Sequence, residues 1–182
     1  WFPTKTHTTR VPSPSTPPSS QHAVLESNIY DDVDHPVYQP PVNVFAKSEL
    51  LDSEQQLMLS GVFSVNRQYS YELCYRGSTH GWSSQAFHSQ CDNKGKTVTI
   101  ARTTAASLGG PRVFGGFAGS SWHTSSSWIS NYDTFLFRFT EEGGFERTDS
   151  VSSTSNAQYG HSSYCPRFGN GDWVISSNCK TG

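Results

Sequence analysis

LCYRGSTHGWSSQAFHSQCDNKGKTVTIART (Leu73–Thr103) is the stretch that decides the fold. Its start belongs to a predicted strand over Tyr69–Tyr75, in which large residues alternate with small or polar ones. A short helix is expected next, with Phe87 and Cys91 on one face because they lie four residues apart. Lys96–Thr103 predicts a second strand. The stretch therefore places a small helix between two strands.

An earlier helix is predicted where the chain first becomes apolar. Asp52 or Ser53 is a suitable cap for its start, and Gly61 marks its expected end. Its buried face is expected to carry Leu57 and Met58. This helix would enter the globular domain from the N-terminal side.

Strands dominate the rest of the chain. Arg112–Ala118 and Thr134–Thr140 are predicted strands, and Phe168–Ile175 predicts a hairpin. The serine-rich tracts Ser120–Ser127 and Thr148–Ser155 are predicted loops. This order favours an α+β, mainly β fold: an antiparallel β-sandwich with a few short flanking helices, preceded by an extended N-terminal arm.

The four cysteines are Cys74, Cys91, Cys165 and Cys179, and they allow three pairings if all are bridged. Proximity along the chain favours two local disulfides, Cys74–Cys91 and Cys165–Cys179. The alternative is four buried thiols in a cytosolic protein. No CxxC or HxxxH spacing is present, so neither a metal site nor a cofactor is expected.

Residues 1–41 form the predicted arm, and 42–182 the globular domain. Eight of the ten prolines lie at or before Pro41, and fourteen of the first twenty residues are Pro, Ser or Thr. Such a segment cannot offset its ordering cost by burial, so we expect a neighbouring subunit or attached sugars to hold it. Its later part is the most able to dock as a strand, through Val24, Leu25, Ile29, Tyr30, Val33, Val37 and Tyr38.

Charge and motifs exclude several function classes. The formal net charge is -2, with 13 basic and 15 acidic residues well mixed, so nucleic acid is not an expected partner. No apolar run approaches the roughly 20 residues of a membrane span. Neither GxSxG, HExxH, a P-loop nor GxGxxG after a strand occurs, and a non-enzyme is expected.

Some side chains leave alternatives open. His80 and His88 could act as bases or serve as capping and surface histidines. The tryptophans other than Trp1 could stack on sugar rings or fill the core; they are Trp82, Trp122, Trp128 and Trp173.

Five segments in register resemble a TLDc domain. They are LCYRGSTHGWSSQAFHSQCDNKG (73–95), TVTIART (97–103), VFGGFAGSSW (113–122), NYDTFLFRF (131–139) and YCPRFGNGDWVISSN (164–178). SELLDSEQQLMLSGVF (48–63) is similar to that family's entry helix. The resemblance implies an antiparallel sandwich flanked by short helices. Gly115 and Gly116 would then allow close strand approach, and Gly169 and Gly171 would supply positive φ.

The intracellular members of that family are associated with resistance to oxidative damage and with binding the vacuolar ATPase, without an agreed catalytic set. No catalytic residue is therefore carried over to this chain. The arm and the additional cysteines depart from those members.

The arm has a resemblance of its own, since SPSTPPSS (13–20) is similar to hydroxyproline-rich glycoproteins of algal and plant extracellular matrices. No N-x-S/T sequon occurs, so glycans are expected to be O-linked. The candidate positions are Thr4, Thr6, Thr8, Thr9, Pro12, Ser13, Pro14, Ser15, Thr16, Pro17, Pro18, Ser19 and Ser20.

The leading hypothesis is a secreted glycoprotein subunit whose arm engages the next copy and so builds an extracellular filament. One alternative is an extracellular carbohydrate-binding or adhesion module on a glycosylated stalk, using an exposed tryptophan such as Trp122 or Trp128. Another is an intracellular TLDc domain of the usual kind.

Overall fold

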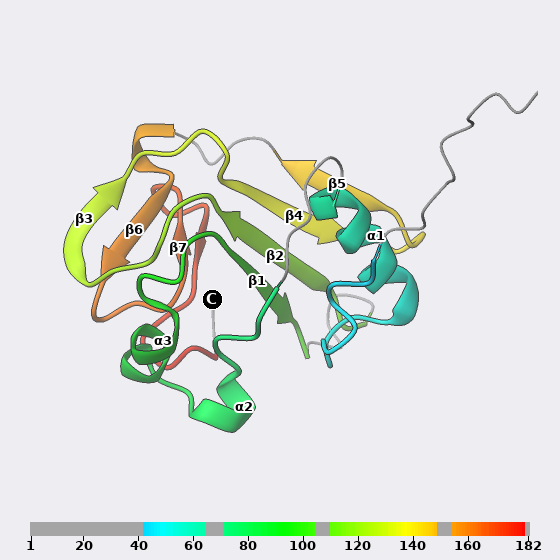
Figure 1. Cartoon of the computed structure of the whole chain (residues 1–182), viewed down its shortest axis with the longest axis horizontal. Coiled ribbons are helices and arrows are strands. Elements are labelled where there is room, and N and C mark those ends of the chain that lie inside the picture. Colours follow the sequence, from blue (N-terminus) through cyan, green and yellow to red (C-terminus); the bar gives the residue numbers. More distant parts are fainter. Residues whose placement is uncertain (1–41, 65–70, 105–109, 149–153, 181–182) are drawn as a thin grey trace, which may run out of the picture. The chain divides into compact units, whose positions relative to one another are not determined.

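The computed structural model describes residues 42–64, 71–104, 110–148 and 154–180 (Figure 1). The chain divides into two units, Trp1–Tyr38 and Gln39–Gly182, and the described residues belong to the second. All predicted glycosylation and docking residues of the arm lie outside the described residues, so they stay predictions.

Two four-stranded antiparallel sheets make up the domain, and this confirms the predicted fold class. The first sheet has the order β1-β2-β4-β5: Thr97–Arg102, Val113–Ala118, Phe135–Phe139 and Phe145–Thr148. The second has the order β3-β6-β7-β8: Ser125–Ile129, Gln158–His161, Arg167–Phe168 and Trp173–Val174. The described helices are α1 (Ser53–Ser64), α2 (Gly77–His80), α3 (Ser84–Cys91) and the 3-10 turn η2 (Thr154–Asn156).

Helix α1 begins where the sequence predicts. The Asp52 carboxylate accepts a hydrogen bond from the Gln55 amide at 2.9 Å, and the Gln55 side chain accepts one from the Asp52 amide at 3.2 Å. This reciprocal arrangement is a capping box. The predicted end at Gly61 is wrong because the helix continues to Ser64.

The buried face of α1 differs from the prediction in one of its two residues: Met58 packs half-buried against the core, as predicted, but Leu57 does not. Leu57 is 48% exposed, whereas Leu59 and Phe63 are buried. Leu59 and Phe63 lie four residues apart and so form one stripe. Leu59 lies before Gly61 and Phe63 lies after it. Because both side chains pack into the core, the helix continues through a glycine that would otherwise weaken it.

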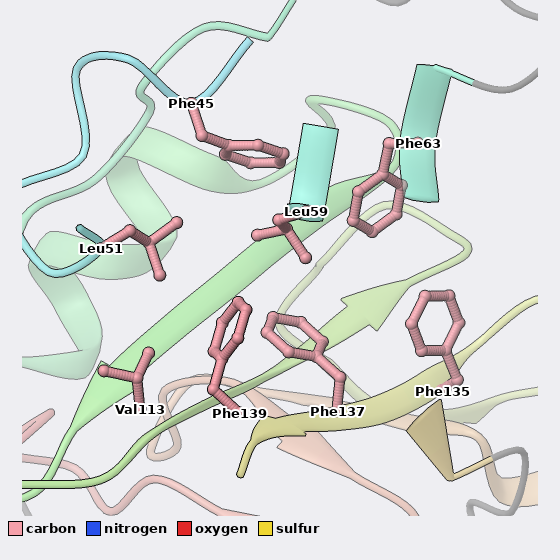
Figure 2. Packing of buried hydrophobic residues seen from close by; sticks show 8 residues of the cluster. All are labelled: Phe45, Leu51, Leu59, Phe63, Val113, Phe135, Phe137 and Phe139. Atoms are coloured by element: carbon pink, nitrogen blue, oxygen red, sulfur yellow. The ribbon is translucent and has the colours of Figure 1, made fainter. Parts of the chain in front are cut away.

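A first core forms between α1 and one face of the first sheet (Figure 2). Strand β4 supplies Phe135, Phe137 and Phe139, which share a face because side chains alternate along a strand. The Phe63 ring stacks on Phe135 with centroids 6.0 Å apart. The buried members are Phe45, Leu51, Leu59, Phe63, Val113, Phe135, Phe137 and Phe139.

A second core lies between the sheets, centred on the fully buried ring of Phe168. A Cβ placed on Gly116 would lie 2.6 Å from that ring, so β2 has no room for a side chain here. The rings of Trp122 and Trp173 pack on Phe168 at 5.4 and 5.3 Å. Gly169, in the β7–β8 turn, has a φ of 60°, as the resemblance implies.

The predicted strand Tyr69–Tyr75 is wrong in its described part, since residues 71–75 form no strand. Alternation fails because Leu73 is 55% exposed. Side chains anchor the segment instead: Tyr71 packs on the first core and Tyr75 on Phe87.

Strands β3, β5 and β6 were not predicted. Ser125–Ser127, predicted as loop, belongs to β3 because the backbone pairs with β6, Ser127 opposite Gly160. Likewise Thr148, predicted to start a loop, ends β5. Strands β3 and β5 are mostly exposed and polar, so they form through pairing with a neighbouring strand and not through propensity.

Two glycine substitutions test this packing. Gly116→Ala should lower the free energy of unfolding by about 2 kcal/mol, because the methyl group collides with the Phe168 ring. In matched contrast, Gly61→Ala in α1 should raise it by about 0.5–1 kcal/mol, because an added Cβ meets nothing within 4 Å. Chemical denaturation measures both, and a stabilising Gly116→Ala would contradict the inter-sheet contact.

Candidate functional site

Two disulfides close the second core. Cys74 joins Cys91, with Cα atoms 5.5 Å apart, and Cys165 joins Cys179 at 5.6 Å. This is the pairing favoured by proximity along the chain. The first bridge holds the segment before α2 against α3, and the second fastens the C-terminal segment beside β7. The described residues include all four cysteines, and none of these is a free thiol.

His88, considered above as a possible base, is buried at 8% exposure. Its Nδ1 lies 2.7 Å from the Asp92 carboxylate. Its Nε2 lies 3.0 and 2.9 Å from the backbone carbonyl oxygens of His161 and Tyr164. Because carbonyls only accept hydrogen bonds, Nε2 must carry the proton and donate it. His88 therefore joins α3 to the end of β6 and to the segment after it, and both ring nitrogens face protein partners and not a substrate.

His80 and Tyr75 also have structural roles. His80 accepts a hydrogen bond at Nδ1 from the Arg76 amide, at 2.9 Å, and so supports the start of α2. The Tyr75 hydroxyl donates to the Gly81 carbonyl at 2.7 Å. Burial raises the pKa of the Tyr75 hydroxyl above its ordinary value, so this hydroxyl stays protonated to a higher pH than a free tyrosine.

Three of the carboxylates that could take part in acid–base chemistry are paired with basic side chains: Asp92 with His88, Asp133 with Lys96, and Glu141 with Arg112. Within the described ranges, no three His, Cys, Asp or Glu side chains gather closely enough to hold a metal ion.

The tryptophans divide into core and surface. Trp122 is 1% exposed and donates from Nε1 to the Thr97 hydroxyl at 2.9 Å, so its proposed role as an exposed sugar platform is wrong. Trp173 stacks inside the second core. Trp82 is 46% exposed beneath Lys180, and Trp128 is half-buried on the second sheet.

An apolar hollow of about 300 Å³ opens on the first sheet, on the face opposite α1. Leu136 and Arg138 alternate with the buried phenylalanines of β4 and so point to this face. Phe114 and Trp173 complete the apolar floor, with ring centroids 5.2 Å apart. The rim includes Arg138, Glu146, Thr148 and Asp172.

The hollow exists because the second sheet covers the first only partly. The β7–β8 hairpin places Phe168 over β2, whereas Leu136 in β4 stays half-buried. An ion pair between Arg138 and Glu146, 2.6 Å apart, closes one side. The sequence signal was the unbroken apolar run Phe135–Phe137, which is typical of a strand with apolar surface on both faces.

A second hollow, of about 520 Å³, lies beside α3 and is lined by Gln85, His88, Ser89, Asp92, Thr124 and Ser162. Since the His88 ring is committed to its three partners, we assign this cavity no chemistry.

The domain is mainly β, with two antiparallel sheets, short helices and two disulfides. No described helix is long and apolar enough to cross a bilayer. The family model of the TLDc domain matches residues 44–182. The chain therefore belongs to the TLDc family, which confirms the resemblance. A search of the curated proteins found no match.

The disulfides give a direct test of the redox state. The intact mass of the native chain should rise by about 4 Da on reduction, because each bridge takes up two hydrogen atoms (two electrons from the added reductant and two protons). The double variant Cys165→Ser/Cys179→Ser should lose about 3 kcal/mol of unfolding free energy, because an open loop gains entropy when unfolded. An unchanged mass would favour the reduced, intracellular alternative.

Proposed function

We propose that this protein is an extracellular structural subunit that polymerises when the arm of one copy docks in the apolar hollow of the next. The observation that carries the proposal is the hollow itself, with a floor of Phe114, Leu136 and Trp173. Apolar surface left open beside a core is a common mark of an interaction site. The proposed partner is a second copy of the chain, and the role is structural and not enzymatic.

The arm has the chemistry to fill this hollow. Its later part carries Val24, Leu25, Ile29, Val33 and Val37, whereas its first twenty residues are mostly Pro, Ser and Thr. Strand β5 is at the edge of the first sheet, so an extended segment can pair with it. Every second side chain of that segment would then lie over the hollow face.

The geometry of assembly follows from the two different surfaces. A contact between an arm and a hollow is heterologous, so it propagates into a fibre unless rotation closes a ring. An arm of 41 residues reaches roughly 3.1 Å per residue when extended as polyproline II, which is ample for reaching another copy.

Secretion and glycosylation are part of the proposal. Two disulfides are typical of oxidising compartments. In such a compartment the Ser, Thr and Pro residues at positions 4–20 become available for O-linked sugars, which would stiffen the arm and keep it extended. The mixed charge gives no support to nucleic-acid binding.

Sedimentation velocity and electron microscopy of the full chain test the proposal. Deletion of residues 1–41 should abolish assembly, and so should Ile29→Asp, which replaces an apolar docking side chain with a charge. Thr148→Arg should also abolish it, because Thr148 is exposed on β5 at the rim and a long side chain there obstructs the hollow.

Thr79→Arg is the matched control, since Thr79 is exposed on α2 away from the hollow. It should assemble normally. Monomers of the full chain at all concentrations, or filaments that survive deletion of the arm, would refute the proposal.

A further inference from the structure

The outer face of the second sheet carries a row of large side chains that the proposed function does not use. Trp128 in β3 pairs with Tyr159 in β6, and Arg167 in β7 pairs with Val174 in β8. All four are half-buried. They point outward because their neighbours Gln158 and Phe168 are buried between the sheets. We call Trp128, Tyr159, Tyr164 and Arg167 the arginine platform.

The guanidinium of Arg167 is enclosed by three rings. Its Cζ lies 5.0 Å from the Trp128 ring centroid, 4.8 Å from that of Tyr159 and 5.2 Å from that of Tyr164. Such cation–π contacts fix the orientation of the guanidinium plane. The side chain is therefore ordered before any ligand arrives, which reduces the entropy lost on binding.

Arg167 has no acidic partner among the described residues, unlike three of the other arginines. Arg76, Arg112 and Arg138 each pair with a glutamate. Arg167 makes no ion pair with any described residue, and its Nε is buried without a hydrogen-bond partner there. The positive charge therefore lacks a counter-charge among the described residues. An anion from outside would supply one, and the planar fork suits a carboxylate or a sulfate.

The surroundings favour a saccharide over a peptide. Flat rings stack well on the C–H face of a sugar, and Tyr159 and Tyr164 carry hydroxyl groups that can both donate and accept hydrogen bonds. Peptides generally use a strand edge, a groove or side-chain pockets. The platform lies on a sheet face, and neither described cavity is lined by its residues.

We propose that the arginine platform binds an oxyanion-bearing saccharide, either a uronate or a sulfated sugar. The ring of the sugar stacks on Trp128 and Tyr159, and its carboxylate or sulfate accepts hydrogen bonds from the Arg167 guanidinium. This site is separate from the hollow and does not depend on assembly.

Titration calorimetry of the full chain with four probes tests the proposal. Oligogalacturonate and sulfated dextran oligomers carry the two possible anions, neutral dextran carries none, and poly-glutamate is an anion without sugar. One or both anionic saccharides should bind saturably, and the better one identifies the anion. Neutral dextran and poly-glutamate should bind at least about tenfold more weakly. Equal binding of neutral dextran, or tighter binding of poly-glutamate, would overturn the saccharide assignment.

Variants separate the platform from general charge. Arg167→Met should weaken saccharide binding about tenfold or more, and Arg167→Lys, which keeps the charge and much of the packing, should still weaken it because the fork is lost. Arg102→Met removes the same charge at an exposed position of β1 and should bind like the unmodified chain. Equal losses in Arg102→Met and Arg167→Met, or wild-type binding by Arg167→Lys, would contradict the proposal. Circular dichroism of each variant confirms folding.

Discussion

The contact between the Phe168 ring and Gly116 is the constraint on which the rest of the domain depends. It sets the distance between the sheets, because any side chain at Gly116 would occupy the space of the ring. It also fixes which residues of the β7–β8 hairpin point inward. With Phe168 inside, Arg167 must face outward, and the hairpin lies over β2 while Leu136 in β4 stays only half-covered. The hollow and the arginine platform both follow from this one placement.

Buried polar groups and disulfides hold the second sheet in that position. Gln158 in β6 is fully buried; its side chain accepts from the Ser120 amide and donates to the Ser120 carbonyl, both at 3.1 Å. His88 joins α3 to the end of β6 and to the segment after it, and Cys165–Cys179 fastens the C-terminal segment to β7. Because unpaired buried polar groups are costly, these bonds specify one arrangement of short strands that have little intrinsic preference for pairing.

The sequence predicted the elements whose pattern is local. Examples are the strands with alternating apolar residues, the face of α3 that carries Phe87 and Cys91, and the two disulfides between cysteines close in sequence. It failed where tertiary contacts override local preference: β3 forms from exposed serines, α1 continues through Gly61, and Tyr71 is an anchor without a strand. The apolar run Phe135–Phe137 indicated that both faces of β4 are apolar, but the hollow itself depends on how far the second sheet covers the first. Trp128 was named as a possible sugar-stacking residue, but its grouping with Arg167 depends on the pairing of β3, β6 and β7. The arm rests on composition alone and stays a prediction.

The protein contains a disulfide-linked TLDc domain. We propose that this domain assembles through its hollow and binds anionic sugars on a separate face. The central claim is that a neighbour's arm occupies the hollow. Cryo-electron microscopy of the native full chain tests this most directly. The account predicts filaments in which the arm of one copy lies against Phe114, Leu136 and Trp173 of the next. Dispersed particles, or filaments in which the hollow is empty, would contradict it.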